Sequence, residues 1–598
     1  MGSTSKVARR RPTRLEVLLG ISLLVLCIAV YGTSLTGFFS GTDTFSLIET
    51  GRVDELRDLG RILARPLMAG TGFPSIALYY RPLSSLSFGF DHWIWGLRPF
   101  GYALTNLLLH AANTLLVFLL LRTQGRLGLT AAWLGAAIFL LSPIMVEVVP
   151  VMSRRQDMLA LLLGLLALLG YRAANQRTGG SQILRAGSVA LFGLGLMAKE
   201  IAVVFAVLIP ADRILVAPEE RKATLEDLRQ GLRDSLPYLV VLTLFLVLRF
   251  LVLGGMGGEQ SHGGIVDPGG LGRALQISAE FFQELIDPSK ALVSSGPTTW
   301  APALFASIVL FGAAAGIARR RAEAPSGSRR GLLGWGSDNS AAAKVLLVAG
   351  CLCIGLGLAA AGSLPAAIEG EAVSGAGRVV VRGLVLGVGL AGLLLVTLRS
   401  SRLERSSLGR AQRSAYYGLW ILIPLAIYMA TGTYSGRAVY VPAVGVAATI
   451  AGLVDALPTA FAAPGARDLR HPSLIGWAGA GAVLLFLTGS MMLSSPAVKG
   501  LGEWPAKSRL AQSFFAEFES KIGQRGPCQQ IVITGLPDRG TIGLEEYSVQ
   551  SWLHLRYPGW DAQVNLDDRV AMTTIPADLK LRAGECRDGR LTAQIELP

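Results

Sequence analysis

The chain has 598 residues, of which 51% are hydrophobic and only 16% are charged, and its mean hydropathy is positive at +0.49. This balance predicts a polytopic α-helical membrane protein, because many stretches approach the roughly 18–20 apolar residues that span a bilayer. The net charge of +14 does not indicate a nucleic-acid partner, because the arginines gather in alternate loops instead of forming one patch.

Apolar segments recur along most of the chain, and we count about 13 candidate membrane spans. The first, 16–36, is too long for a cleaved signal peptide and shows no small-x-small cleavage site before Thr36. The others are expected near 102–121, 131–149, 157–172, 185–198, 201–217, 236–254, 301–318, 345–363, 379–398, 416–432, 437–456 and 474–494.

The basic residues follow the positive-inside pattern, which makes their loops and the N-terminal tail, 1–15, cytoplasmic. An odd number of spans then puts the C-terminal tail on the outside of an inner (cytoplasmic) membrane. The basic loops contain Arg122 and Arg126; Arg172 and Arg177; Arg221, Lys222, Arg229 and Arg233; Arg319, Arg320 and Arg321; and Arg399, Arg402 and Arg405.

Two long outer loops are expected, at about 37–101 and 255–300. The first contains SLIETGRVDELRDLGRILA, which predicts one short amphipathic helix, followed by the aromatic-rich run YYRPLSSLSFGFDHWIWGLRPFGY. Tyrosine and tryptophan favour the headgroup zone, so this second part is expected along the outer interface. The second loop is glycine-rich and then amphipathic, LGRALQISAEFFQELI, which predicts another interfacial helix.

The membrane domain is expected to cover 16–495, and the tail, 497–598, differs from it in character. The tail lacks long apolar runs and predicts a small α+β domain, with QQIVITGL and LTAQIELP as strands and LAQSFFAEFESKI as a helix. No repeat of 20–50 residues is present, so a tetratricopeptide array is excluded. Cys528 and Cys586 are the two tail cysteines; an oxidising exterior would allow them to pair, but the sequence leaves this open.

Six ionisable residues fall on the outer side of the membrane in this topology: Asp43, Glu147, Asp157, Lys199, Glu200 and Arg437. A charge at membrane depth costs at least a few kcal/mol unless it faces a cavity or a partner, so each is a functional candidate. Their concentration on one face predicts that chemistry or transport happens there.

Each candidate has a structural alternative. Asp43, just beyond the first span, is a candidate general base, but also an ordinary loop acid or a helix N-cap. Arg155, beside Arg154 and Asp157, would either bind a phosphate or join a structural ion-pair network with Glu147 and Asp157. Lys199 and Glu200 interrupt an apolar run, and neighbours on a helix do not pair face to face, so each needs another partner. Lys199 would either neutralise a phosphate in an outer cavity or simply lie in a hairpin turn.

Further polar residues complete the outer face. Arg81 and Arg437 add cations, and Tyr440 lies at the start of the same span as Arg437. His110, in the middle of a span, is interpreted as a buried, hydrogen-bonded histidine before it is interpreted as a ligand. The sequence contains no HExxH, no Walker loop and no paired CxxC, which argues against a nucleotide-driven pump.

Three runs, in order, carry a family resemblance: YRPLSSLSFGFDHWIWGLRPFGYALTNLLLHAANTLLVFLLL, SPIMVEVVPVMSRRQDMLA and MAKEIAVVFAVLIPAD. They resemble the membrane half of the TMTC-like O-mannosyltransferases and their bacterial relatives, which belong to the GT-C class of glycosyltransferases. The similarity covers roughly 16–215, with a weaker echo at 436–445. Two features depart from the family: one acid replaces two adjacent acids in the first outer loop, and the tetratricopeptide tail is missing.

The resemblance implies inverting transfer of a sugar from a polyprenyl-phosphate donor to a protein, lipid or glycan acceptor on the extracytoplasmic side. It implies that Asp43 is the base, and it puts Glu147, Arg155, Asp157, Lys199 and Glu200 on matching family positions. We expect Arg81, Arg155, Lys199 and Arg437 to bind the donor phosphate, with Glu200 and Tyr440 in support. Glu147 or Asp157 would position the base or share Mg²⁺ or Mn²⁺ with Asp43. The interfacial loop helices would hold the prenyl chain against membrane lipids.

Two other classes of function remain open. A lipid-linked saccharide transporter or flippase would need inverted repeats around a midplane site, and none is visible. A non-catalytic membrane scaffold would keep the helices and bind a partner through its tail, and the single acid in the first loop is its best support.

Overall fold

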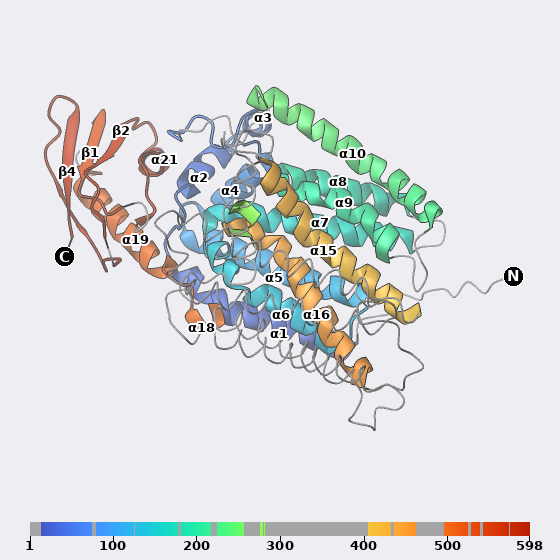
Figure 1. The fold of residues 1–598 in the computed structure, drawn as a ribbon. Helices are drawn as coiled ribbons and strands as arrows, with labels where there is room; N and C mark the ends of the chain where they lie inside the picture. The colour runs from blue at the N-terminus through green and yellow to red at the C-terminus, as the bar shows by residue number, and fades with distance from the viewer. Residues whose placement is uncertain are drawn as a thin grey trace, which may run out of the picture.

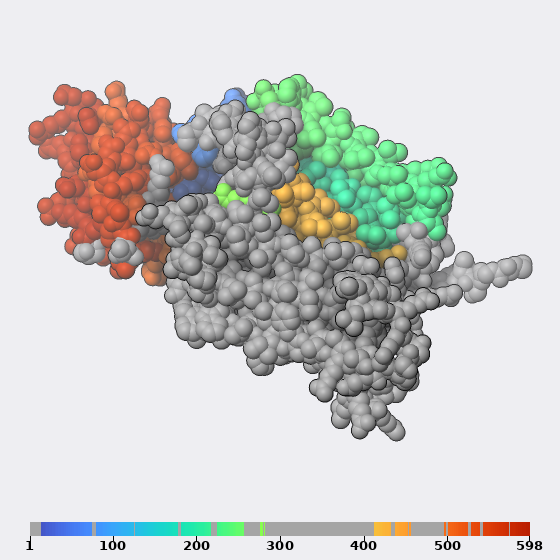
Figure 2. Space-filling view, in the orientation of Figure 1, coloured from blue at the N-terminus to red at the C-terminus, as the bar shows by residue number. Residues whose placement is uncertain are grey.

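The computed structural model shows a body of packed helices with the C-terminal tail at one end (Figure 1). The space-filling view shows the tail, in red, projecting from that end of the body (Figure 2). The structure describes residues 13–73, 79–124, 126–176, 181–216, 224–255, 276–278, 280–281, 405–431, 436–461, 496–523, 528–538, 542–572 and 574–597.

The helical body is built from α-helices joined by short 3-10 segments. Its N-terminal elements are α1 (Arg14–Tyr31), η1 (Gly32–Thr36), α2 (Thr44–Gly51), α3 (Leu56–Ala64), α4 (Pro82–Trp95), α5 (Pro99–Thr123), α6 (Leu129–Leu141) and η2 (Pro143–Glu147). The elements that follow are η3 (Met152–Arg154), α7 (Arg155–Asn175), α8 (Gln182–Ala198), η4 (Glu200–Val204), α9 (Phe205–Ala211), the π-helical η5 (Asp212–Val216), α10 (Leu225–Leu253), α15 (Arg405–Thr431), η8 (Gly436–Tyr440) and α16 (Pro442–Phe461).

Within the part of the chain that the structure describes, five helical stretches are long and apolar enough to cross a bilayer: Arg14–Thr36, Pro99–Thr123, Met152–Asn175, Leu225–Leu253 and Gln412–Thr431. In the first and fourth only 17% of the apolar window is buried, so both present apolar side chains outward, as lipid-facing helices do. The described chain is therefore mostly helical and suited to a multi-pass membrane protein. The predicted spans 301–318, 345–363, 379–398 and 474–494 lie outside the described residues, so the count of 13 stays a prediction.

Three predicted helices have different bounds in the structure. The span predicted at 131–149 ends as an α-helix at Leu141, because Pro143 lacks the N–H that would continue the helix, and 3-10 segment η2 follows. The span predicted at 201–217 is divided into η4, α9 and η5. The single helix predicted in the first outer loop is two helices, α2 and α3.

The break after α2 has a packing reason. Arg52 caps α2 in an extended conformation, and the preceding Gly51 touches the backbone of α4. A Cβ atom on Gly51 would lie 2.2 Å from the carbonyl oxygen of Ser85, and one on Gly89 would lie 1.9 Å from the carbonyl oxygen of Gly51. Glycine at both positions lets α2 and α4 approach backbone to backbone, which fixes the helix that follows Asp43.

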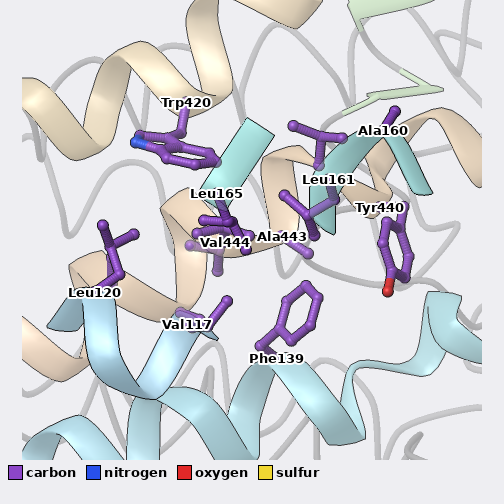
Figure 3. Packing of buried hydrophobic residues seen from close by; sticks show 14 of the residues in the cluster. Val117, Leu120, Phe139, Ala160, Leu161, Leu165, Trp420, Tyr440, Ala443 and Val444 are labelled. Carbon is purple, nitrogen blue, oxygen red and sulfur yellow. The ribbon is translucent and has the colours of Figure 1, made fainter. Parts of the chain in front are cut away.

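One large apolar core holds the body together. Figure 3 shows its centre, where Val117 and Leu120 of α5, Phe139 of α6, Leu161 and Leu165 of α7 and Val444 of α16 meet. Trp420 of α15 packs edge to face on Phe205 of α9, with ring centroids 5.4 Å apart. Segments far apart in sequence are therefore joined by side-chain packing, which sets the positions of the polar residues at the helix ends.

The tail contains a four-stranded sheet in the order β2-β1-β4-β3. Its strands are β1 (Gln530–Thr534), β2 (Gln563–Asp567), β3 (Lys580–Ala583) and β4 (Arg590–Glu596), and its helices are α18 (Pro496–Lys499), α19 (Trp504–Lys521) and α21 (Glu546–Arg556). β1 runs parallel to β2 and β4, whereas β3 is antiparallel to β4. Both strands and the helix predicted in the tail are therefore found, as β1, β4 and α19.

Cys528 and Cys586 form a disulfide with their Cα atoms 6.1 Å apart. Cys27 is buried in α1, and Cys351 and Cys353 lie outside the described residues.

The tail packs on the first outer loop through shared apolar residues. Phe39 and Phe45, on either side of Asp43, belong to the same buried core as Phe515 of α19 and Trp552 of α21. The rings of Phe45 and Phe515 meet edge to face at 5.1 Å. The loop that carries Asp43 therefore lies between the helical body and the tail, with α2 facing α21 (Figure 1).

Candidate active site

The predicted outer residues lie at one end of the body. At this end, the Tyr31 hydroxyl in the last turn of α1 donates to the Leu140 carbonyl oxygen at the end of α6 (2.8 Å). At the other end of the body, Arg122 in the last turn of α5 pairs with Glu16 in the first turn of α1 (2.7 Å). Asp43 follows α1 and η1, Asp157 lies in the first turn of α7, and Lys199 caps the end of α8. Alternating helix directions put all three at the end that adjoins the tail.

Five charged side chains from four parts of the chain make contact there: Arg81, Asp157, Lys199, Glu200 and Arg249, which we call the charged cluster. Arg81 pairs with Glu200 at 2.8 Å, Arg249 pairs with Glu200 at 2.5 Å, and the Lys199 ammonium donates to Asp157. Among the residues that the structure describes, three cations of the cluster face two carboxylates, which gives one excess positive charge. Such a site suits an anion.

The end of α8 explains why adjacent Lys199 and Glu200 have different partners. Lys199 leaves the helix in an extended conformation (φ −162°, ψ 144°), and Glu200 begins 3-10 segment η4. The change of direction sends Lys199 to Asp157 of α7 and Glu200 to Arg81 and Arg249. The prediction that each needs its own partner is confirmed.

The charged cluster is only partly closed. The side chains of Glu200 and Lys199 are 30% and 13% exposed, whereas Asp157 is 3% exposed. The second carboxylate oxygen of Asp157, Oδ2, is buried and accepts no hydrogen bond within the described part of the chain. Arg81 is held by stacking over the Tyr79 ring, 4.2 Å from its centroid. Held cations beside a reachable edge can receive a phosphate without rearranging.

Arg155 has a different environment and is fully buried. It pairs with Asp91 of α4 at 2.5 Å and donates to Asn106 Oδ1 at 3.1 Å. It also donates to the carbonyl oxygens of Ser87 (3.0 Å) and Tyr102 (3.1 Å). Every guanidinium nitrogen has a partner here, which favours the structural alternative for Arg155, and its binding of the donor phosphate stays a prediction. The side chain joins α4, α5 and α7.

Asp43 stands at the N-cap position of α2, but its side chain makes no cap hydrogen bond. Its Oδ1 accepts instead from the hydroxyl of Tyr547, in α21 of the tail, at 3.0 Å and from the Thr42 hydroxyl at 3.1 Å. The N-cap alternative is therefore confirmed for the position of Asp43 but not for a capping hydrogen bond of its side chain. The half-buried carboxylate is held from two sides and remains reachable.

Glu147, Arg437 and Tyr440 lie on two 3-10 segments, η2 and η8, that pack against each other. Glu147 was expected inside an apolar helix, but it is exposed at the end of η2, because the helix stops before Pro143. Arg437 is half-buried in η8. The structure thus brings Glu147 near the segment of Arg437 and not into the charged cluster.

Tyr440 is fully buried and belongs to the interior of the helical body. Its hydroxyl meets His110 Nδ1 at 3.0 Å and accepts from Asn113 Nδ2 at 3.2 Å. The interpretation of His110 as a buried, hydrogen-bonded histidine is confirmed. The Tyr440 hydroxyl is thus bonded within the core, and its supporting role in the site stays a prediction.

The residues proposed for a divalent cation do not fit one. No three His, Cys, Asp or Glu side chains come together in the described ranges in a way that could hold a metal ion. Asp43 and Asp157 have separate partners, Tyr547 and Lys199, and Glu147 stands apart at the end of η2. The Lys199 ammonium already pairs with Oδ1 of Asp157.

Three residues of these sites were missed by the sequence analysis: Asp91, Arg249 and Tyr547. Arg249 interrupts the apolar run VLRFLVL of α10, so the rule that identified Lys199 could have found it. Asp91 lies among the aromatic residues of the first loop, where its acid stood out less. Tyr547 carries no local signal, because it reaches Asp43 only after the tail has folded onto the loop.

Comparisons with known proteins support the resemblance to the TMTC-like O-mannosyltransferases. The chain is 33% identical over 186 residues to protein O-mannosyl-transferase Tmtc1 of Drosophila melanogaster, covering 30% of this chain and 20% of that protein. It is 29% identical over 176 residues to protein O-mannosyl-transferase TMTC1 of Mus musculus, covering 29% and 19%. The matched part therefore spans about a fifth of the length of these curated relatives.

No family model matches the chain. Among solved structures, ArnT from Cupriavidus metallidurans bound to undecaprenyl phosphate aligns over 92% of this chain and 85% of that one. The sequence identity is 14% and the TM-score is 0.39, which is too low to support any argument about this chain.

Proposed function

We propose that the protein is a GT-C-type membrane glycosyltransferase that moves a sugar from a polyprenyl-phosphate donor to an acceptor hydroxyl on the extracytoplasmic face. The observation that carries this proposal is the charged cluster, with its excess positive charge, at the same end of the body as Asp43. The similarity to proteins named as O-mannosyltransferases supports sugar transfer as the reaction.

The donor phosphate would lie against the charged cluster. A phosphate leaving group needs no general acid, because cations that stabilise its developing charge are sufficient. Arg81 offers a guanidinium already fixed by Glu200 and Tyr79, and Lys199 offers a partly exposed ammonium fixed by Asp157. The two carboxylates thus keep the cations in place and leave one positive charge for the ligand.

Asp43 would act as the general base. The acceptor oxygen attacks the anomeric carbon on the face opposite the phosphate, so the new C–O bond forms as the bond to phosphate breaks. The acceptor proton passes to Asp43, and the electron pair of the broken bond leaves with the phosphate, which gives inversion. The loop of Asp43 is tied to the start of α7, because Ser40 donates to the Pro150 carbonyl oxygen at 2.6 Å.

The proposal includes a topology. The N-terminus lies in the cytoplasm of a cell with an inner membrane, and the tail lies outside. The arginine-rich loops support this orientation through the positive-inside rule. The tail disulfide Cys528–Cys586 also supports it, because disulfides persist in oxidising compartments.

The test uses the full-length protein, purified, with labelled polyprenyl-phosphate sugars and a panel of hydroxyl acceptors. The Asp43→Asn variant is expected to lose at least about 100-fold in transfer rate and to keep its affinity for the donor. Asp54→Asn is a matched control, because Asp54 is an exposed acid of the same loop that pairs with Arg52 on the surface.

Other outcomes separate the rival functions. Retained turnover in Asp43→Asn would remove Asp43 as the base. Passage of the labelled donor across a proteoliposome membrane without transfer would indicate a transporter, and neither transfer nor passage would indicate a scaffold.

A further inference from the structure

Helix α21 of the tail lies along α2, and polar side chains meet at matching intervals of three to four residues on both helices. The Tyr547 hydroxyl donates to Asp43 at 3.0 Å, the hydroxyls of Ser551 and Ser46 meet at 2.8 Å, and His554 Nδ1 meets Glu49 at 2.8 Å. Since the numbers increase together, the two helices run in the same direction. Each of the three contacts pairs one particular position of α21 with one position in or next to α2, and Asp43 makes the first of them.

Tyr547 is held so that its hydroxyl faces Asp43. Its ring packs edge to face on Phe73 at 5.1 Å. The first loop also closes tightly on this part of α21: a Cβ atom on Gly72 would lie 2.8 Å from Gln550 Oε1 and 3.4 Å from Tyr547 Cβ. The phenol is therefore clamped between Asp43 on one side and the 72–73 segment on the other.

The chemistry of this contact suits a base. Burial, and then the negative charge of Asp43, raise the pKa of Tyr547 above its ordinary value, so the phenol stays protonated and donates. Tyr547 and Thr42 both donate to Oδ1 of Asp43. Oδ2 accepts no side-chain hydrogen bond found among the residues that the structure describes, which leaves this oxygen for an acceptor proton.

We propose that Tyr547 is a positioning residue for Asp43, so that the tail completes the site of the base. This inference rests on the proposed function. Tyr547 holds one carboxylate oxygen of Asp43 so that the other is aimed at the acceptor hydroxyl. The tail, which contains no tetratricopeptide array, thereby contributes to the environment of the catalytic base.

The experiment compares the pH–rate profiles of the full-length wild-type protein and the Tyr547→Phe variant in sugar transfer. Tyr547→Phe keeps the ring against Phe73 and removes only the donated hydrogen bond. We expect kcat/KM to fall about tenfold and the acidic limb of the profile to move up by about one pH unit, with the KM for the donor unchanged.

Ser551→Ala is the matched control. It also removes one hydrogen bond between α2 and α21, but it does not touch Asp43. If the contact served docking alone, both variants would lose activity and thermal stability together, and neither would move the acidic limb.

The outcomes distinguish this inference from the function on which it rests. In one outcome, the wild type transfers sugar and Asp43→Asn does not, while the pH–rate profile of Tyr547→Phe overlies that of the wild type. This result overturns the role of Tyr547 alone. An equal shift in Ser551→Ala also overturns it. Absence of transfer in the wild type overturns the proposed function and this inference with it. A shift in Tyr547→Phe only establishes the role.

Discussion

The Arg155 site and the charged cluster are built from the same kinds of side chain at the same end of the helical body, yet they differ in balance. Arg155 pairs with one carboxylate, Asp91, and its other N–H groups donate hydrogen bonds to Asn106 and to backbone carbonyl oxygens. In the charged cluster three cations share two carboxylates, and Glu200 and Lys199 are partly exposed.

The difference shows what a charge at membrane depth means. Both sites carry the desolvation cost that marks a buried charge, so cost alone does not separate function from structure. What separates them is whether the partners use up the charge and whether a ligand can reach it. By this measure Arg155 is structural, and Arg81 and Lys199 are candidates for ligand binding.

The largest expected effect tests the structural side of this comparison. Arg155→Met leaves Asp91 buried without its cation, and removing one partner of a buried ion pair costs about 3–5 kcal/mol. We expect a large fall in the thermal midpoint of the protein in detergent, with donor binding unchanged in the fraction that remains folded.

The controls sharpen this prediction. Arg52→Met removes an exposed arginine paired with Asp54 and is expected to change stability by less than about 0.5 kcal/mol. The double variant Arg155→Met/Asp91→Leu is expected to recover part of the lost stability, because no uncompensated charge remains. An Arg155→Met protein that is as stable as the wild type but no longer binds donor would return Arg155 to the phosphate site.

The sequence could predict which end of the helices carries the candidate residues, because span order and arginine-rich loops define the two faces. It could not predict their partners. Asp157 and Lys199 are 42 residues apart, and Arg81 and Glu200 are 119 apart, so these pairs depend on how the helices pack. The end of α6 was readable from Pro143, whereas the close approach of α2 and α4 at Gly51 was not.

The site of Asp43 marks the limit most clearly. Its environment comes from a tyrosine 504 residues away in a domain of different composition. Local patterns give the helix α21 and the loop, but nothing in either segment specifies that they meet. The shared apolar core of Phe45, Phe515 and Trp552 brings them together, and this core forms only in the complete fold.

The next effect, of intermediate size, tests the ligand-binding side of the comparison. Arg81→Met is expected to weaken donor binding about tenfold, the loss of one charge-assisted hydrogen bond to phosphate. Stability is expected to change little, because Glu200 keeps Arg249 at 2.5 Å. Equilibrium binding of labelled donor, together with the thermal midpoint, separates the two quantities.

Arg185→Met is the matched control for net charge. Arg185 is exposed near the start of α8, at the end opposite the charged cluster, and donates to Asn175. Equal losses of donor affinity in both variants would mean that overall charge, and not the charged cluster, attracts the donor. A collapse of stability in Arg81→Met would make the charged cluster structural, like the Arg155 site.

The smallest expected effect concerns the partly exposed contact between His554 and Glu49. The hydrogen bond with Glu49 raises the pKa of His554 above its ordinary value, burial opposes this, and the charges of Glu49 and Asp561 add to it. Because the folded pKa is raised, the stabilisation is fully present below the ordinary pKa of histidine, near 6.5, and is lost as pH rises through the folded value. The α2–α21 contact is therefore expected to be tighter at pH 6 than at pH 8, by less than about 1 kcal/mol.

Hydrogen exchange of the α2 and α21 amides, corrected for intrinsic rates, measures this difference. His554→Gln should abolish it, and equal protection of the wild type at both pH values would show that a partly exposed pair of this kind does not stabilise the tail against the loop.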